Sequence, residues 1–222
     1  MKGLALIALV FSVFVAPTQA ASRATYICDG YPSGMWPNLR PQLIDSNVLV
    51  PAGATCRLYV SEVTGNVVVE GVLAGFGNTF DRNVIVTGGE VFFPIPIGSH
   101  GLGRSHVQGN LHITTDGRVA VSARVDGNVS LEGAIYADFT YAAIGGNVSV
   151  KNSANVLFFD VGTRDDPGIG GNLSLVGNAD VGISWTSIGG KLGCEGNDPA
   201  PAVGDHVNAR DATGQCSLTP AT

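Results

Sequence analysis

The chain has 222 residues, including 31 glycines, and charged residues make up only 14% of it. Its formal net charge of −6 argues against nucleic acid or an anionic membrane surface as a partner, because both select basic patches. High glycine and low charge are typical of many short buried strands joined by tight turns, and this length can bury a sizeable core as one domain.

Residues 1–20 have the features of a secretory signal peptide. Lys2 supplies the charged start, residues 4–16 form an apolar run, and Ala20 ends a group of small residues at the expected cleavage site. The run is too short to span a bilayer, and no later stretch reaches the ~18 apolar residues that a spanning helix needs. We therefore expect an exported chain without a membrane span, secreted, at the cell surface or in the periplasm.

Residues 21–62 are predicted to form an N-terminal cap and the first coil of a repeating structure. The segment 31–37 is rich in turn-forming residues and carries large apolar side chains such as Trp36. Such a segment can cover the end of a stack of strands, where backbone groups would otherwise be unpaired. Residues 45–60 are expected to form the first coil itself.

A short phrase recurs through residues 63–194, where a glycine or another small or polar residue precedes an asparagine and alternating apolar residues. Its asparagines are Asn66, Asn83, Asn110, Asn128, Asn147 and Asn172. Successive differences in number are 17, 27, 18, 19 and 25, which indicates a solenoid with coils of 18 or so residues. A degenerate copy at Gly190 closes the series, and the repeat phrases together predict about seven coils.

Within these coils an apolar residue recurs at every sixth position. The series contains Val107, Ile113, Val119, Val125, Leu131, Ile144, Val150, Val156, Ile169, Leu175, Val181, Ile188 and Cys194. Three six-residue segments make one coil, which predicts three short sides around an apolar interior. A helix is excluded because positions six apart drift around its 3.6-residue turn and do not share one face. The predicted fold is all-β: a parallel β-helix, or β-solenoid, of triangular cross-section, with right-handed winding favoured.

The six repeated asparagines are predicted to be structural. Equivalent residues of successive coils lie about 4.8 Å apart in a parallel stack, so stacked asparagine side chains can form a hydrogen-bonded ladder. We also expect the glycine and asparagine of each phrase to supply the left-handed backbone angles that a corner needs.

Four cysteines lie near the two ends of the exported chain. An even number in an oxidising compartment predicts two disulfides, and the favoured pairs are Cys28–Cys56 and Cys194–Cys216, since each would close one end of the solenoid. Sequence alone leaves the other two pairings open. Residues 195–222 then form a C-terminal disulfide cap. Neither pair has CxxC spacing, so we predict no metal and no cofactor.

Two long intervals between asparagines predict loops on one side of the solenoid. Against an 18-residue coil they add 9 and 7 residues (27 − 18 and 25 − 18), and both begin roughly ten residues after their asparagine. Three coil steps of ~4.8 Å would separate them, so they could flank a shallow groove over the coils of Asn110 and Asn128. The candidate ligand-binding residues are Phe92, Phe93, Phe158, Phe159, Arg164, Asp165 and Asp166. The alternative is that both loops are insertions without function.

The acidic cluster at Asp160, Asp165 and Asp166 raises the possibility of an enzyme. Parallel β-helices that cleave acidic polysaccharides use clustered carboxylates to hold calcium or as acid–base pairs. An arginine beside aspartates in a turn is more often a solvated surface pair, however, and no phosphate loop or nucleophile–base set is recognisable. His106 and His112 are six apart and should therefore fall on different faces, which argues against a metal site.

The ends of the chain carry a family resemblance. The stretch from Cys194 to Pro201, the later Gly214-Gln215-Cys216, residues 50–56 and the Ile-Gly-Gly-Asn repeats resemble a group of secreted, repeat-rich bacterial β-solenoid proteins of unknown activity. The resemblance covers most of the exported chain. It implies an exported parallel β-helix and transfers no site residue. The repeat region is also similar to bactofilins, which are polymer-forming triangular β-helices.

Together these features predict an exported, non-catalytic scaffold that binds carbohydrate or protein. The expected partner is an extracellular carbohydrate or protein, and self-association is possible. Two alternatives remain, a polysaccharide-active lyase or glycoside hydrolase and a self-assembling structural solenoid.

Overall fold

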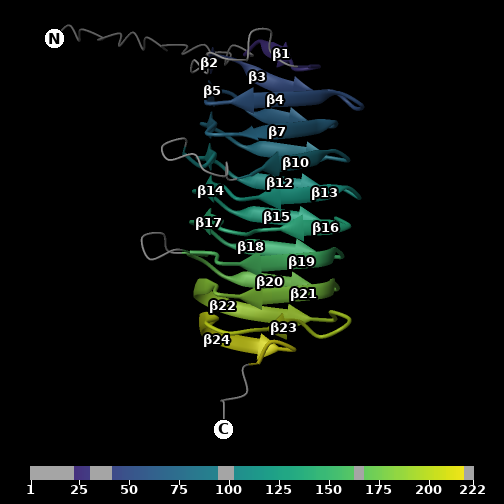
Figure 1. Ribbon diagram of the computed structural model, residues 1–222, viewed down its shortest axis with the longest axis vertical. Coiled ribbons are helices and arrows are strands. Elements are labelled where there is room, and N and C mark those ends of the chain that lie inside the picture. Colours follow the sequence, from purple (N-terminus) through teal and green to yellow (C-terminus); the bar gives the residue numbers. More distant parts are fainter. Residues whose placement is uncertain (1–22, 31–41, 95–102, 163–167, 218–222) are drawn as a thin grey trace, which may run out of the picture.

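The computed structural model describes residues 23–30, 42–94, 103–162 and 168–217. The expected signal peptide and the apolar cluster at 31–37 lie outside these ranges. Within them the chain is all strand and turn, with no helix, and forms a parallel β-solenoid of about 9 turns with three sheets. Figure 1 shows the turns stacked along the long axis, in sequence order from the N-terminal to the C-terminal end.

Three parallel sheets form the sides of the solenoid. The first sheet has ten strands, in the order β1 (Thr25–Ile27), β3 (Asn47–Val50), β6 (Val67–Val69), β9 (Val84–Thr87), β12 (Leu111–Thr114), β15 (Val129–Glu132), β18 (Val148–Lys151), β20 (Leu173–Val176), β22 (Ser187–Glu195) and β24 (Asn208–Gly214). The second has eight, namely β4 (Thr55–Tyr59), β7 (Val72–Phe76), β10 (Glu90–Phe93), β13 (Arg118–Val121), β16 (Tyr136–Asp138), β19 (Ala154–Phe159), β21 (Ala179–Ser184) and β23 (Ala202–Val203). The third has six, namely β2 (Gln42–Ile44), β5 (Ser61–Val63), β8 (Thr79–Phe80), β11 (His106–Val107), β14 (Arg124–Val125) and β17 (Ala143–Ile144).

Each turn runs through the third sheet, then the first, then the second. The turn formed by β14, β15 and β16 is an example, and single bridges at Ile169 and Ile188 continue the third sheet below β17. The chain therefore bends at three corners per turn, which we name by the sheets that they join. The first–second corner and the second–third corner are the two that flank the second sheet.

The apolar interior follows the predicted six-residue period. Every member of the predicted series is buried, and Val107, Val119 and Val125 have no exposed surface. Alternate residues of each strand point inward, because successive side chains of a strand face opposite ways. Each fully buried Val, Leu or Ile contributes roughly 1.5–3 kcal/mol, so the column of the three sheets dominates the stability of the fold.

The solenoid is longer than the repeat phrase predicts, with about 9 turns in place of about seven. One turn precedes the series of phrases, at the first coil expected for residues 45–60, where Ser46 precedes Asn47 at the start of β3 in place of a glycine. Another follows it, because β23 and β24 pair in parallel with β21 and β22. The described part of the C-terminal cap thus continues the stack.

Both predicted disulfides are present, Cys28–Cys56 and Cys194–Cys216, each with a Cα–Cα distance of 5.4 Å. The first joins Cys28, directly after β1, to Cys56 in β4. The second joins Cys194 in β22 to Cys216, two residues after the end of β24. Each end of the stack is therefore tied to a neighbouring turn. The described residues contain no helix long and apolar enough to cross a membrane.

Candidate functional site

The repeated asparagines stand in one column at the corner where the third sheet passes into the first. The backbone N–H of Asn110 donates to Oδ1 of Asn83 at 2.8 Å, and that of Asn128 donates to Oδ1 of Asn110 at 2.9 Å. The same bond links Asn66, Asn83, Asn147 and Asn172 to the preceding turn. The column begins at Asn47, and the Lys191 N–H closes it on Asn172.

These bonds differ from a simple stack of side-chain amides. The main link runs from backbone N–H to side-chain oxygen, and side-chain amide bonds of 3.2–3.3 Å accompany it only at Asn110, Asn128 and Asn147. Each asparagine thus satisfies a backbone donor at a corner, where no sheet partner is available. These bonds link each turn to the next along the corner.

The glycine before each asparagine does not serve the purpose that the sequence suggests. Left-handed backbone was expected there, but neither Gly127 nor Gly146 has a positive φ. A Cβ at Gly127 would lie 2.6 Å from Oδ1 of Asn110, and one at Gly146 would lie 2.6 Å from Oδ1 of Asn128. At Gly127 and Gly146 a side chain would collide with the column, although Ser46 and Arg82 occupy the equivalent position before Asn47 and Asn83. The expectation of left-handed angles at these glycines is wrong.

A second set of amides, which the sequence analysis missed, includes the buried Asn178 and Asn197 and ends at the exposed Gln215. The backbone N–H of Asn178 donates to Oδ1 of Asn197 at 2.9 Å, and the Asn197 N–H donates to Oε1 of Gln215 at 2.8 Å. The buried Asn178 side chain also donates to the Val150 carbonyl oxygen at 2.9 Å. The available signal was the Gly-Asn pairs at Gly177 and Gly196, which fall outside the phase of the main repeat.

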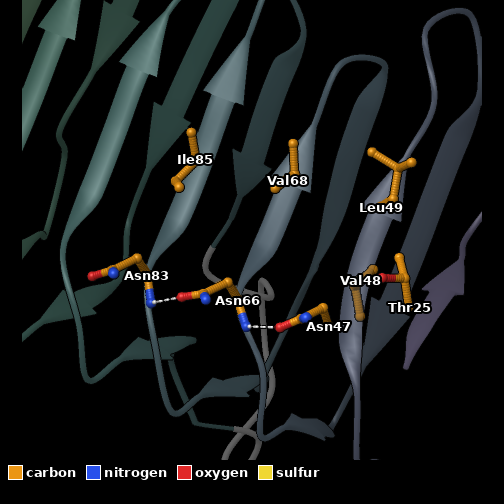
Figure 2. A pocket seen from close by; sticks show the side chains of 8 residues that line it. All are labelled: Thr25, Asn47, Val48, Leu49, Asn66, Val68, Asn83 and Ile85. Atoms are coloured by element: carbon orange, nitrogen blue, oxygen red, sulfur yellow. Dashed lines mark hydrogen bonds between the residues drawn. The ribbon is translucent and has the colours of Figure 1, made fainter. Parts of the chain in front are cut away.

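A groove of about 420 Å³ lies against the first sheet near its N-terminal end. Figure 2 shows the row Leu49, Val68 and Ile85 beside the column of Asn47, Asn66 and Asn83. The aliphatic row is in register across β3, β6 and β9, and continues as His112 on β12 and Ser130 on β15. The asparagines here already bond to each other, so the groove offers mainly aliphatic contact.

Two of the four phenylalanines predicted to contact a ligand are core residues. Phe93 and Phe158 are fully buried, and the rings of Phe139 and Phe158 stack with centroids 4.8 Å apart. β10 and β19 extend through these residues, so neighbouring phenylalanines face opposite ways. The predicted ligand contact is therefore wrong for Phe93 and Phe158, whereas Phe92 is half-buried and Phe159 is 39% exposed.

The described ends of both inserts lie at the second–third corner. The first connects β10 to β11, and the second connects β19 to the bridge residue Ile169. β13 and β16 separate β10 from β19 in the second sheet, so the inserts are three turns apart at the same corner. Arg164, Asp165 and Asp166 lie outside the described residues, as does His100.

The predicted separation of His106 and His112 onto different sheets is confirmed, since they lie in β11 and β12. His106 Nε2 lies 2.8 Å from Oδ2 of Asp126, and Arg124 Nε donates to Oδ1 of the same carboxylate at 2.8 Å. Burial raises the pKa of Asp126, but the hydrogen bonds of Arg124 and His106 outweigh it, so this pKa lies below its usual value. Among the described residues, no group of three His, Cys, Asp or Glu side chains could hold a metal ion.

The second–third corner carries a column of four residues, of which the sequence analysis singled out only Asp160. Tyr141, Asp160, Trp185 and His206 follow one another on successive turns. The Tyr141 N–H donates to the Phe159 carbonyl at 3.0 Å, the Asp160 N–H to Ser184 at 3.2 Å, and the Trp185 N–H to Asp205 at 2.9 Å. All four have left-handed backbone, with φ between 50° and 58°.

The first–second corner meets the same backbone requirement with different residues. In the corresponding turns its left-handed positions are Gly133, Asn152, Gly177 and Gly196, which are also linked turn to turn. Glycine and asparagine tolerate this conformation, whereas for a bulky side chain it is an outlier that costs about 1–2 kcal/mol. At the second–third corner the outliers by this criterion are Tyr141 and Trp185, together with the β-branched Val60 between β4 and β5.

The aromatic side chains of this corner face solvent. Tyr141 is 38% exposed, Phe159 39% and Trp185 51%, and the Trp185 ring contacts the His206 ring with centroids 4.1 Å apart. We call Tyr141, Phe159, Asp160, Trp185 and His206 the aromatic corner. The six-residue period does not mark these residues, and only Phe159 and Asp160 were named from the sequence.

Comparisons of the chain with protein-family models, with curated proteins and with solved structures give no match. The function of the chain has to be inferred from its own geometry.

Proposed function

We propose that this chain is an exported, non-catalytic β-solenoid that binds carbohydrate at its aromatic corner. Export is supported by the N-terminal apolar segment of the sequence and by two disulfides, which persist in oxidising compartments. The observation that favours binding is the placement of Tyr141 and Trp185, bulky exposed side chains at backbone positions that favour glycine.

The side chains of the corner suit the chemistry of sugars. Aromatic ring faces pack against the apolar C–H faces of sugar rings, and tyrosine and tryptophan also bring a polar group to such a surface. The carboxylate of Asp160 is a strong acceptor for hydroxyl groups, and it lies in the same column between Tyr141 and Trp185.

The scaffold gives these side chains a fixed spacing. The N–H groups of Tyr141, Asp160 and Trp185 are each hydrogen-bonded to the next turn, and equivalent positions repeat at the ~4.8 Å distance of neighbouring strands. Binding residues carried by a rigid framework lose little conformational freedom when a ligand binds. Backbone strain that the fold does not need is typical of functional sites.

The direct test is retention on immobilised polysaccharides. We expect the disulfide-bonded chain to be retained by at least one glycan of a broad panel, and Trp185→Asn to lose that retention, since asparagine keeps the left-handed backbone and removes the indole. Ile135→Ala is the matched control, because Ile135 is 55% exposed and precedes β16 at the first–second corner, on the other side of the second sheet from Trp185. Equal retention of the Trp185→Asn protein, or no retention of the original chain by any glycan, would contradict the proposal.

The same preparations test the alternatives. Release of reducing ends or unsaturated products from a bound polysaccharide would indicate an enzyme, and ligand-free filaments seen by light scattering would indicate a self-assembling solenoid. Retention by a cell-surface protein but by no glycan would identify the corner as a protein-binding surface.

A further inference from the structure

We propose that the aromatic corner selects linear glycans without acidic groups and holds them parallel to the solenoid axis. This inference rests on the proposed carbohydrate binding and adds the charge class and the direction of the ligand.

The direction follows from the geometry of the column. Tyr141, Asp160, Trp185 and His206 are one turn apart, so three steps of ~4.8 Å carry the column across ~14 Å along the axis. Tyr141 and Trp185 are two turns apart and are separated by a residue with an oxygen acceptor. A ligand across the axis would meet only one aromatic side chain of the column, whereas one along it meets both.

The charge class follows from the titratable groups around the column. The fully described segments 138–143, 157–162, 182–187 and 202–208 contain three carboxylates, Asp138, Asp160 and Asp205, and no lysine or arginine. His206 is their one basic side chain. A uronic acid or sulfated sugar on the column would place its negative charge beside these carboxylates, which disfavours binding.

Asp160 has the central part in this discrimination. It lies between the two aromatic residues and is half-buried, so its charge is less screened by solvent than that of the exposed Asp205. Asp138 is engaged with its neighbours, since its Oδ1 accepts the Thr140 N–H at 2.8 Å. The hydroxyl groups of a neutral sugar can donate hydrogen bonds to the Asp160 carboxylate. A carboxylated sugar instead brings a second hydrogen-bond acceptor and a like charge.

The charge inference is tested with pairs of polysaccharides that differ in one group. Hydroxyethyl cellulose, galactomannan and soluble starch are each compared with their derivatives oxidised to the acid at the primary hydroxyl. For the neutral polymer that is retained, we expect binding about tenfold tighter than to its oxidised derivative at low salt, and a smaller ratio at about 1 M salt. Equal or tighter binding of the oxidised derivative would overturn the charge inference.

Asp160→Asn isolates the residue responsible, because asparagine has nearly the same shape and tolerates the left-handed backbone. We expect this variant to narrow the neutral-to-acidic ratio by about fivefold, the effect of one nearby like charge near a surface. Asp116→Asn removes an exposed carboxylate at the first–second corner and should leave the ratio unchanged. An unchanged neutral-to-acidic ratio in Asp160→Asn, with an intact thermal transition, would show that Asp160 does not discriminate between neutral and acidic glycans.

The direction is tested with oligosaccharides of increasing length from the retained polymer. Affinity should rise with length and level off once the chain covers the ~14 Å of the column. A plateau at a single sugar would overturn the axial direction. If the original chain binds no glycan of either charge, the proposed function itself fails; if it binds both charge classes equally, only the selection fails.

Discussion

Gly177 and Trp185 flank the same strand, β21, and share the same left-handed backbone, with φ values of 66° and 50°. Gly177, two residues before the strand, is the residue type that this conformation favours. Trp185, directly after the strand, is among the types that it strains most. Since both corners of one turn require the conformation, tryptophan was not selected there by the backbone. This contrast is the observation on which the proposed binding role of the aromatic corner rests.

The contrast predicts that the aromatic corner can be made more stable. We expect Tyr141→Gly to leave the free energy of unfolding unchanged or raise it by up to about 1 kcal/mol, because relief of the left-handed strain offsets the lost contacts and the greater freedom of unfolded glycine. Urea denaturation measures the change. Gly133→Ala, with φ 83° and its Cβ 3.0 Å from the Thr115 carbonyl oxygen, should lose about 1–2 kcal/mol. A loss of more than about 1 kcal/mol in Tyr141→Gly would mean that the tyrosine serves the fold.

The interior column predicts a severe effect of charge at its centre. Val125 on β14 has no exposed surface, so Val125→Asp would bury an unpaired carboxylate and cost about 3–5 kcal/mol. Thermal unfolding followed by circular dichroism provides the measurement. Ser130→Asp on the exposed face of β15 should change stability by less than about 0.5 kcal/mol. Unchanged melting of the Val125→Asp protein would refute the assigned register.

Removing a buried amide should lower the free energy of unfolding more than removing an exposed one. Asn178 is buried and bonds to Asn197 and to the Val150 carbonyl, so Asn178→Ala leaves backbone groups without partners and should cost about 2–4 kcal/mol. Asn128 is exposed, and water can replace its oxygen at the Asn147 N–H, so Asn128→Ala should cost about 0.5–1.5 kcal/mol. Denaturant melts of both variants give the comparison, and equal costs would contradict the role of burial.

The disulfides should matter mainly to the ends of the stack. The Cys194–Cys216 bridge closes a separation of 22 residues, for which loop-closure entropy gives about 3 kcal/mol. Because each turn contacts only its neighbours, Cys194→Ser with Cys216→Ser should release β24 before the central turns. Hydrogen exchange should show lost protection in β24 and retained protection in β15. A uniform loss along the whole chain would indicate a single cooperative unit instead.

The contacts of the Asp126 carboxylate with Arg124 and His106 predict that the free energy of unfolding depends slightly on pH in the acidic range. Its pKa is lower in the folded chain than the ordinary value of about 3.9, so it adds stability above about pH 4 and loses it as the pH falls through the folded value. The carboxylate is 39% exposed, so the contribution should be only about 0.2–1 kcal/mol and should shrink with salt. Asp126→Asn should show this deficit at about pH 6 and none below about pH 2. A deficit that persists in acid would point to packing rather than charge.

The sequence by itself determined the architecture. Buried valine, leucine and isoleucine at every sixth residue, with asparagine once per turn, describe a stack in which each contact joins neighbouring turns, so the period is visible along one dimension. The cysteine pairing that the sequence favoured, with two others left open, is the one present. The two inserts did not disturb this reading, because they leave at a corner and the strands on either side keep their register.

Only the tertiary structure decided which side chains face outward and which meet. One residue more or less of strand reverses the side that a side chain faces, which is why Phe158 is in the core and Phe159 is outside. The aromatic corner joins residues 19, 25 and 21 positions apart (160 − 141, 185 − 160 and 206 − 185), with an insert between two of them. These unequal spacings become equal steps only when the turns stack, because hydrogen bonds between turns fix the axial rise while the loops absorb the additional residues.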